Sequence, residues 1–557
     1  MYSDKKIIQS LGEIFKAKSI YHLALSPGSR NAPMIVQFTQ QSAFKTYSVV
    51  DERCAGFFAL GMAQQLRKPV VLNCTSGSAV ANYYPAVTEA FYQNIPLILL
   101  TADRPKEFID LFEGQTIRQE NFFQNHVVKS VQLTEDESVR GLWYNERLIN
   151  EALNEALLRQ KPVHINVPLS EPLYGTTDRL QVQPKIIDIP NTRLSIDENS
   201  FKEYRKIWSH SKKKMILIGQ NNPTQQLDKA LVDLSQDPSV IILTETLANI
   251  HHTDFISHID RMISPMTEQE WKDFQPEILV AIGKNIISKK IKTLLRTQPP
   301  IHHWYVEASR EHNPDTYHRL TAYWTVPPED LLEKFQDMEK TVSDYREKWM
   351  LLKTYRQKRH NLFLESIKFS DLKAFDQTFK KIPDHTILQL GNSTVIRYQQ
   401  LFDQKPSILS HCNRGTAGID GSTSTAIGAA VASRHPVTLI IGDISFFYDS
   451  NALWIGYVPD SFRTILINNG GGNIFRFIPG PNSSSALENY FETKHPFTAQ
   501  HLCQAYHWEY DQANDITTLS NALEKFWTDS KKPRLLEINT QGYKNEYILN
   551  EYFKFLI

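Results

Sequence analysis

Residues 437–443 read VTLIIGD, a run of apolar and β-branched residues that ends in Gly442 and Asp443. Residues 465–475 read ILINNGGGNIF and repeat this form, with the turn beginning at Asn468 and Asn469. Short apolar runs that end in turn residues are typical of strands buried in a parallel sheet. Ligands of such sheets bind outside the carboxyl ends of the strands. The two stretches therefore predict an α/β fold with a ligand site at these strand ends.

The pair Asp443 and Asn469, 26 residues apart, resembles the motif that holds a divalent cation against a diphosphate in thiamine-diphosphate enzymes. Magnesium prefers hard oxygen ligands in an octahedron and keeps phosphate oxygens among them. Asp443 offers a carboxylate, Asn469 an amide oxygen and Gly471 a backbone carbonyl. The alternative is a pair of ordinary turns, in which glycine, aspartate and asparagine are common. We expect a site for Mg²⁺, or for Mn²⁺.

Strands alternate with helices along the whole chain, which predicts three α/β domains, each a doubly wound parallel sheet. Predicted strands lie at 21–25, 69–74, 96–100, 163–167, 215–218, 240–243, 278–282, 303–306, 387–390, 437–441, 464–467 and 535–538. We place the domains at residues 1–180, 195–345 and 360–557. Weak periodicity and two prolines predict a linker at 176–200, and a strongly charged stretch predicts a helix at 335–368.

Composition narrows the class of protein. A chain of 557 residues is too long for one hydrophobic core. Lys plus Arg and Asp plus Glu both number 61, so the net charge is zero and no nucleic acid partner is expected. Four cysteines without CxxC spacing form no disulfide framework and fit a reducing cytoplasm. The longest apolar runs are too short for a membrane span, so we expect a cytoplasmic protein.

Glu52 opens the helical stretch DERCAGFFALGMA at residues 51–63, at a predicted strand-to-helix junction. A carboxylate in the first turn of a helix is also favoured by the helix dipole, which is the structural alternative. Thiamine enzymes need a carboxylate beside N1′ of the aminopyrimidine, because hydrogen bonding there favours the imino tautomer that removes the C2 proton. Together with Asp443 and Asn469, this requirement makes Glu52 the expected catalytic residue.

Ten segments resemble one family in their order and spacing. They are LSPGSRNAP (25–33), DERCAGFFALGMA (51–63), TSGSAVANYYPA (75–86), TADRP (101–105), GQTIRQ (114–119), NVPLSEPLYG (166–175), GNSTVIR (391–397), NRGTAGIDG (413–421), GDISFFYDSNAL (442–453) and NNGGGNIF (468–475). The family is that of the 2-succinyl-5-enolpyruvyl-6-hydroxy-3-cyclohexene-1-carboxylate (SEPHCHC) synthases of menaquinone biosynthesis. The resemblance spans residues 26 to about 480 and is weakest in the middle domain. Ile444 stands where the wider superfamily often has glycine.

The resemblance implies a reaction and a set of site residues. The family decarboxylates 2-oxoglutarate on thiamine diphosphate and adds the succinyl carbanion to isochorismate. The implied cofactor-binding residues are Pro27, Gly28, Glu52, Ser76, Gly77, Ser393, Ile419, Gly442, Asp443, Ile444, Ser445, Asn469, Gly471, Gly472, Asn473 and Ile474. The implied substrate-binding residues are Ser29, Arg30, Arg104, Gln115, Lys289, Lys290, Asn392, Ser393, Arg397, Arg414 and Phe475. The implied metal ligands are Asp443, Asn469 and Gly471.

Four of these residues are arginines, and each is expected in a turn bordered by glycine or proline. They are Arg30, Arg104, Arg397 and Arg414. Both substrates carry several carboxylates, so several cations must converge on them. The alternative for each arginine is a surface salt bridge. For Ile419, which is implied to hold the cofactor in its bent form, the alternative is an ordinary core isoleucine.

The resemblance also implies an assembly. Residues 1–180 would bind the pyrimidine and residues 360–557 the diphosphate, with the first domain of one subunit facing the third domain of its partner in a homodimer or dimer of dimers. A thiamine-dependent 2-oxo acid decarboxylase or carboligase with another acceptor stays open. An NAD-dependent oxidoreductase would need GxGxxG after a strand, which we do not find. A non-catalytic relic of the fold would not need Glu52, Asp443 and Asn469.

Overall fold

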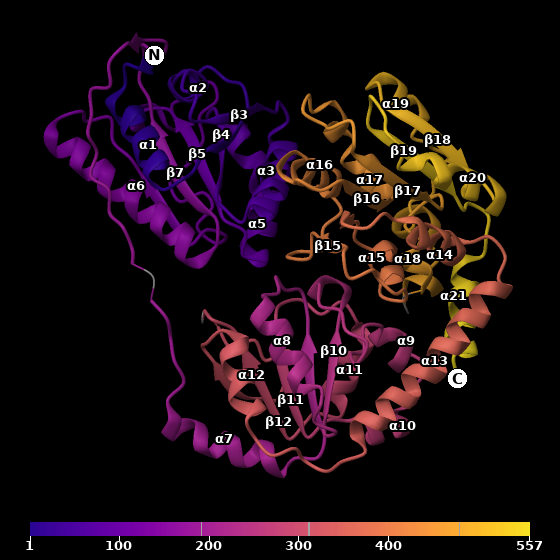
Figure 1. Ribbon diagram of the computed structural model, residues 1–557. Coiled ribbons are helices and arrows are strands. Elements are labelled where there is room, and N and C mark those ends of the chain that lie inside the picture. The colour runs from indigo at the N-terminus through magenta and orange to yellow at the C-terminus, as the bar shows by residue number, and fades with distance from the viewer. Residues whose placement is uncertain (191, 310–311, 478–479) are drawn as a thin grey trace.

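Three parallel β-sheets organise the chain in the computed structural model, which describes residues 1–190, 192–309, 312–477 and 480–557 (Figure 1). Each sheet is flanked by helices, so the predicted class of three doubly wound α/β domains is confirmed. Residue 191, within the predicted linker 176–200, and residues 310–311 and 478–479, within the predicted middle and third domains, lie outside the described residues.

The first sheet has six strands in the order β3-β2-β4-β5-β7-β6, all parallel. Its strands are β2 (His22–Leu25), β3 (Lys45–Ser48), β4 (Val70–Cys74), β5 (Leu97–Asp103), β6 (Lys129–Gln132) and β7 (Val163–Pro168). Its helices are α1 (Lys6–Ala17), α2 (Ala32–Thr39), α3 (Glu52–Leu66), α4 (Ser78–Asn82), α5 (Tyr84–Gln93) and α6 (Val139–Arg159). A two-stranded antiparallel sheet of β1 (Tyr2–Ser3) and β8 (Thr176–Thr177) ties the N-terminus to the end of this domain.

The third sheet repeats this strand order as β15-β14-β16-β17-β19-β18. Its strands are β14 (Ile387–Leu390), β15 (Leu409–Cys412), β16 (Val437–Gly442), β17 (Arg463–Asn468), β18 (Glu509–Ala513) and β19 (Arg534–Asn539). Its helices are α14 (Asp371–Lys381), α15 (Thr394–Gln399), α16 (Ser422–Ala432), α17 (Asp443–Tyr448), α18 (Ile474–Phe477), α19 (Gln500–Ala505), α20 (Ile516–Phe526) and α21 (Asn545–Phe555). The shared order places equivalent strand ends of the two domains in equivalent positions.

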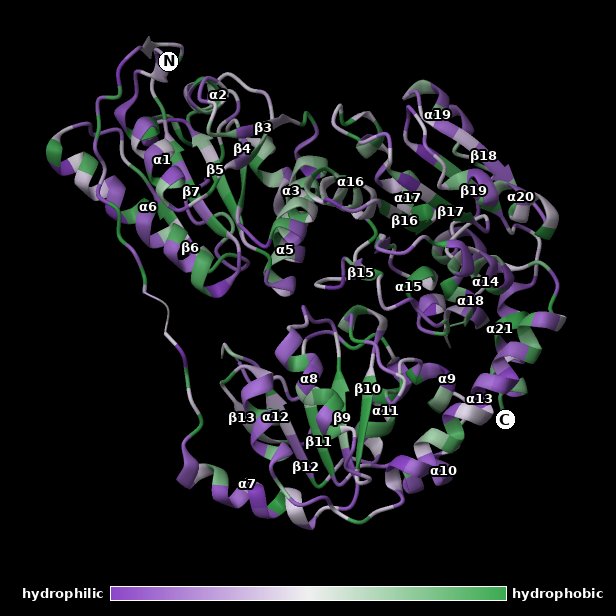
Figure 2. Ribbon diagram, viewed as in Figure 1, coloured by the Kyte–Doolittle hydropathy of each residue, from purple (hydrophilic) through white to green (hydrophobic). Residues whose placement is uncertain are grey.

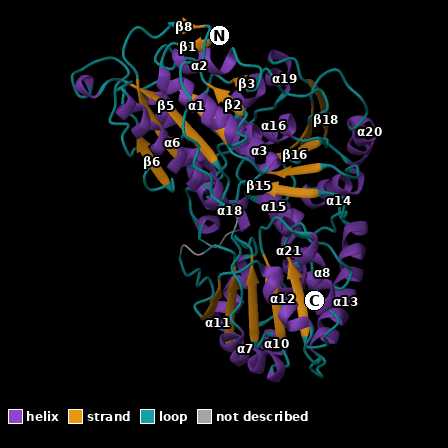
Figure 3. Cartoon of the chain, turned by 60° about the vertical axis from the view of Figure 1, so that its left-hand side comes forward, coloured by secondary structure: helices purple, strands orange, loops and turns teal. Residues whose placement is uncertain are grey.

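The middle sheet has five parallel strands in the order β10-β9-β11-β12-β13. They are β9 (Lys214–Ile218), β10 (Val240–Thr244), β11 (Ile278–Ile282), β12 (His302–Val306) and β13 (Leu320–Trp324). Its helices are α7 (Glu198–His210), α8 (Gln225–Leu234), α9 (Ile259–Ile263), α10 (Glu268–Phe274), α11 (Lys289–Thr297) and α12 (Pro328–Gln336). Its strands point toward the other two domains (Figure 3), so their carboxyl ends lie at the junction of the three.

One hydrophobic core extends from the first sheet to the third. It contains Leu72 and Leu99 of the first sheet, Phe58 of α3, and Leu439 and Ile441 of the third sheet. α3 and α16 lie against each other between the two sheets (Figure 1). Hydrophobic residues run along strands of the middle sheet such as β9, β10 and β11 (Figure 2). All four cysteines are buried and free.

The structure differs from the predicted elements in one helix and in five edge strands. The predicted helix 335–368 is two helices, because α12 ends at Gln336 and α13 begins at Tyr345 and ends at Ser366. The strands β3, β6, β13, β15 and β18, which the sequence did not reveal, all lie at sheet edges. No helix in the described ranges is long and apolar enough to cross a membrane.

Candidate active site

Asp443 is held at the carboxyl end of β16 by the loop that follows the neighbouring strand β17. It is the first residue of α17 and is almost fully buried. Its Oδ2 accepts hydrogen bonds from the backbone N–H of Gly470 at 2.8 Å and of Gly471 at 2.9 Å. Its Oδ1 accepts one from the N–H of Ile444 at 2.7 Å. The fold therefore brings the two motif stretches together at adjacent strand ends.

Asn469 lies beside Asp443 and has an oxygen to offer. Its Oδ1 is buried and has no hydrogen-bond partner among the described residues, whereas its Nδ2 donates to Oδ2 of Asp371 at 2.9 Å. A buried polar atom without a partner is costly unless a ligand satisfies it. Gly471 has φ +150°, a backbone conformation that side chains rarely adopt. These features fit a cation held by hard oxygen atoms.

A cavity of about 510 Å³ opens next to Asn469. Asn473 of the predicted motif lines it, together with four cations or potential cations that the sequence did not single out: Arg476, Lys494, His495 and Lys544. Arg476 is paired with Glu492 through contacts of 2.8 and 2.6 Å. His495 Nε2 lies 3.4 Å from Oδ2 of Asp443. Glu492 and Glu546 line the same cavity, so its charge is mixed. No motif in the sequence predicted this lining.

Asn392 organises the point where the strand order of the third sheet reverses, between β14 and β16. Its Nδ2 donates to the carbonyls of Asn413 and Gly418, both at 2.6 Å. Ser445 Oγ donates to the carbonyl of Ile419 at 3.0 Å. The segments GNSTVIR, NRGTAGIDG and GDISFF thus meet at one switch point, where open α/β sheets bind ligands. Ser393 has φ +73°, a strained conformation of the kind that gathers at functional sites.

Two predicted arginines converge beside this switch point. Arg414 Nη1 donates to Oδ1 of Asn392 at 3.0 Å, and its Nε is buried without a partner among the described residues. Burial lowers the pKa of the Arg397 guanidinium, Asp260 opposes this effect, and the nearby Arg414 adds to it. Two guanidinium groups held close together favour an anionic ligand between them.

Lys292, which the sequence did not single out, lies close enough to these arginines for them to affect its pKa. Burial lowers its pKa, Glu245 opposes this effect, and Arg414 lowers the pKa further. The predicted Lys289 is exposed and Lys290 is half-buried at the start of α11. All three lie within one helical stretch, and only the direction of each side chain separates them. The assignment of Lys289 and Lys290 stays a prediction.

The predicted residues of the first domain gather at the carboxyl ends of β2, β4 and β5. Arg30 is buried, with its Nη1 donating to the carbonyl of Leu169 at 2.8 Å and its Nη2 3.3 Å from Glu171. Arg104 lies close enough to depress the pKa of Arg30 further, beyond the effect of burial. The Nε atoms of Arg30 and Arg104 are buried without a partner among the described residues. Burial raises the pKa of the adjacent Asp103 to about 6.

Loop 114–119 packs onto the turn after β4. Ser76 Oγ donates to the carbonyl of Gln115 at 2.7 Å, and the N–H of Gly77 donates to Oε1 of Gln119 at 2.9 Å. Pro27, Ser29 and Gln115 are exposed, so the surface of this turn is accessible in the single chain.

Glu52 begins α3, as predicted. Asn82 Nδ2 donates to its Oε2 at 3.3 Å, and Asp51 caps the helix by accepting from the N–H of Cys54. No hydrogen bond or ion pair between described residues joins Glu52, Arg30 or Arg104 to Asp443, Asn469, Arg397 or Arg414. Other contacts join the first and third domains. The carboxylate of Glu89 accepts from the N–H groups of Gly415 at 2.6 Å and Thr416 at 2.7 Å, and Arg53 pairs with Asp449 at 3.0 Å.

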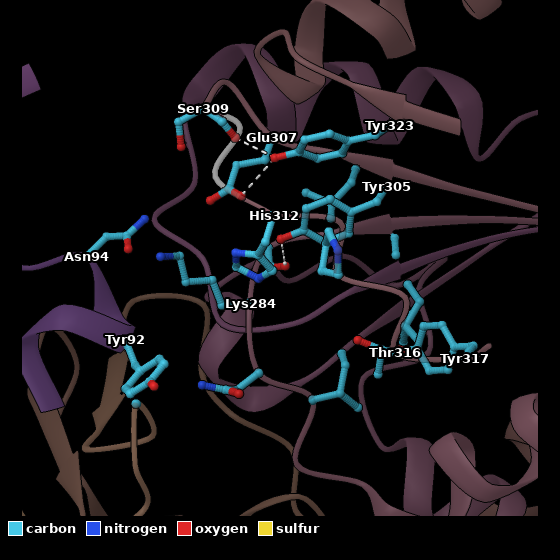
Figure 4. Close-up of a pocket in the computed structure, with 18 of the residues that line it drawn as sticks. Tyr92, Asn94, Lys284, Tyr305, Glu307, Ser309, His312, Thr316, Tyr317 and Tyr323 are labelled. Atoms are coloured by element: carbon cyan, nitrogen blue, oxygen red, sulfur yellow. Dashed lines mark hydrogen bonds between the residues drawn. The ribbon is translucent and has the colours of Figure 1, made fainter. Parts of the chain in front are cut away.

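A second cavity, of about 540 Å³, lies at the carboxyl ends of the middle strands (Figure 4). Lys284, Tyr305 and Glu307 face it from the middle domain, and Tyr92 and Asn94 of the first domain lie on the other side (Figure 4). Tyr305 donates to the carbonyl of Gly283 at 3.0 Å. Lys292 and Gly415 also line this cavity, so it adjoins the arginine pair of the third domain.

Two domains share one sheet order; a first-turn glutamate lies at the strand ends of one, and an Asp–Asn pair with a free amide oxygen among the described residues lies at those of the other. These features define a thiamine-diphosphate-dependent enzyme. Residues 6–133 match the family described as thiamine pyrophosphate enzyme, N-terminal TPP binding domain. Over 557 residues the chain is 46% identical to a 2-succinyl-5-enolpyruvyl-6-hydroxy-3-cyclohexene-1-carboxylate synthase of Flavobacterium johnsoniae, covering 100% of this chain and 99% of that protein.

Relatives with the same name are found in Porphyromonas gingivalis, at 39% identity over 100% of this chain and 98% of theirs, and in Bacteroides thetaiotaomicron, at 36% over 99% of each. The chain belongs to the SEPHCHC synthase family.

Proposed function

We propose that this chain decarboxylates 2-oxoglutarate and adds the remaining succinyl unit to isochorismate, which yields SEPHCHC for menaquinone biosynthesis. The observation that carries the proposal is the grouping of Arg30 with Arg104 and of Arg397 with Arg414 at strand ends, where buried nitrogens of Arg30, Arg104 and Arg414 have no partner among the described residues. Unsatisfied buried donors are costly, and substrates that carry several carboxylates would satisfy them. A neutral acceptor would leave them unpaired.

We infer that Asp443, Asn469 and the carbonyl of Gly471 hold Mg²⁺, or Mn²⁺, against the diphosphate of the cofactor. Two side-chain ligands leave room for phosphate oxygens in an octahedral shell, as magnesium prefers. When bound, thiamine diphosphate supplies a carbon nucleophile that can accept a 2-oxo acid and stabilise the negative charge left when CO₂ departs. Glu52 is proposed to hold a proton at N1′ of the pyrimidine, and Ile419 to support the cofactor from below the ring.

We further propose that the active unit contains two copies of the chain. The cations of the first domain and those of the third form separate groups within one chain, and Glu52 contacts its own domain through Asn82. A partner whose third domain faces Glu52, Arg30 and Arg104 would complete both sites by two-fold symmetry.

Mass spectrometry of the product tests the reaction. Purified chain supplied with thiamine diphosphate, Mg²⁺, 2-oxoglutarate and isochorismate should form SEPHCHC, and the Asp443→Ala variant should form none. Release of CO₂ without a product that contains the isochorismate skeleton would favour the alternative, a thiamine-dependent 2-oxo acid decarboxylase or carboligase with another acceptor.

A further inference from the structure

Two consecutive asparagines after β17 have different surroundings. Every polar group of the Asn468 side chain is used within the protein. Its Nδ2 donates to Glu537 at 2.6 Å and to the carbonyl of Phe497 at 2.8 Å, and its Oδ1 accepts from Gln541 at 3.0 Å. Asn469 makes one side-chain hydrogen bond through Nδ2 and leaves Oδ1 buried and unpaired among the described residues. Only Asn469 is therefore prepared to bind an additional group.

The partner of Asn469 is Asp371, a fully buried carboxylate at the first position of α14. Its Oδ2 accepts from Nδ2 of Asn469 at 2.9 Å, and its Oδ1 accepts from Oγ1 of Thr540. Its backbone N–H donates to Oδ1 of Asn545 at 2.8 Å. Asn469 and Thr540 thus hold the two oxygens of this carboxylate, and Asn545 holds the backbone of the same residue.

The chemistry of this pair fixes which end of the amide faces the site. An asparagine side chain can exchange the places of its oxygen and nitrogen by a half-turn. An ionised carboxylate has only acceptor atoms, so the atom of Asn469 that faces Asp371 must be the nitrogen. The oxygen is then the atom left buried without a partner among the described residues, where a cation could bind it.

We propose that Asp371 is a positioning residue of the metal site, which holds the amide of Asn469 with its oxygen toward the cation. This inference rests on the proposed role of Asn469 as a metal ligand. Partners behind a metal ligand orient it and raise its basicity, and their loss weakens metal binding by about 10- to 100-fold. A purely structural role is the alternative, because a carboxylate at a helix N-terminus also stabilises the helix.

Titration of Mn²⁺ followed by electron paramagnetic resonance, on the full chain with saturating thiamine diphosphate, separates the two roles. Asp371→Ala should weaken Mn²⁺ binding by about 10- to 100-fold. Asp371→Asn should also weaken Mn²⁺ binding, because its amide can donate to Asn469 as well as accept from it and no longer fixes which end of Asn469 faces the site. Thr540→Val is the matched control, because it removes the other partner of the same carboxylate. It should lower thermal stability and leave Mn²⁺ affinity unchanged.

A double-mutant cycle completes the test. In the Asn469→Ala background, Asp371→Ala should cause no further loss of Mn²⁺ affinity, because the amide to be oriented is gone. Additive losses, or native Mn²⁺ affinity in folded Asp371→Ala, would overturn the positioning role. If Asp371→Ala does not fold, native Mn²⁺ affinity in folded Asp371→Asn would overturn it. If Asp443→Ala and Asn469→Ala both bind Mn²⁺ normally, the metal site itself is wrong.

Discussion

Asn468 and Asn469 carry the same side chain, yet the structure assigns them to different tasks. The side chain of Asn468 is fully used in hydrogen bonds to Glu537, Phe497 and Gln541, so it joins the strand ends together. Asn469 has an oxygen without a partner among the described residues. The chemical role of an asparagine is thus decided by the groups that surround it, and neighbouring positions in a motif are not interchangeable.

Glu52→Gln tests the catalytic role at the same scale. Glutamine keeps the shape of the side chain but cannot hold the proton at N1′, so bound thiamine diphosphate should exchange its C2 proton about 10²- to 10⁴-fold more slowly. Nuclear magnetic resonance of the bound cofactor measures this rate. Asp51→Asn is the control: it alters the adjacent carboxylate, which caps α3, and should lower stability with little effect on exchange. Native exchange in Glu52→Gln would remove Glu52 from the mechanism.

Arg104→Ala tests how the arginines divide the two substrates. Arg104 lies with Arg30 in the first domain, apart from Arg397 and Arg414, and we expect it to serve isochorismate. Loss of one partner of a buried charged pair costs about 2–5 kcal/mol, so isochorismate use should weaken while decarboxylation of 2-oxoglutarate survives. Stopped flow can follow the two half-reactions separately.

The control for Arg104 is Arg118→Ala, because Arg118 is exposed and paired with Asp110 near the same loop. Its loss should leave both half-reactions unchanged. A block of the first decarboxylation in Arg104→Ala, with native saturation by isochorismate, would reverse the proposed division.

Interior strands and edge strands differ in how clearly the sequence predicts them. Interior strands such as β4 (VVLNC) and β17 (RTILIN) are buried along their whole length and contain a run of three apolar residues. Edge strands such as β3 (KTYS) and β18 (EYDQA) are half exposed and keep polar residues on the solvent side. Local hydrophobicity therefore predicts the interior strands and the fully buried edge strand β10 (VIILT). It misses the other edge strands, which form only when an interior strand is present to pair with.

Gly61 and Gly428 let α3 and α16 cross closely. A Cβ at Gly61 would lie 1.9 Å from the carbonyl oxygen of Thr425, and one at Gly428 would lie 1.9 Å from that of Phe58. Gly61→Ala should therefore destabilise the protein by about 1–3 kcal/mol, the usual cost of overpacking, although alanine favours helix. Urea unfolding measures this change.

Gly12→Ala in α1 is the matched control for Gly61→Ala, because its new Cβ would meet only the end of the Gln37 side chain. It should cost less than Gly61→Ala. Equal effects of the two substitutions would show that the helix crossing is not the source of the loss.

The first and third domains share one strand order. Within one chain, no hydrogen bond or ion pair between described residues joins the predicted site residues of the first domain to those of the third. We expect a shared site between two chains. A heterodimer of Glu52→Gln with Asp443→Ala, purified through two different tags, should keep about half of the native activity, because one of its two sites is intact. The reciprocal heterodimer carries both substitutions on one chain beside a native partner. It should be inactive, since each site then has one lesion, and the opposite pair of results would place each site within a single chain.

The sequence by itself determined the fold class, the interior strands, the motif turns and the family, because these depend on local apolar runs, turn residues and the order of short segments. Only the tertiary structure decided which of three lysines in residues 289–292 approaches Arg414, and that Glu89 and Asp371 contact the site loops. Those contacts join residues up to hundreds of positions apart and depend on the direction in which each side chain points. The spacing of residues along the chain predicts neither these long-range contacts nor the directions of the side chains.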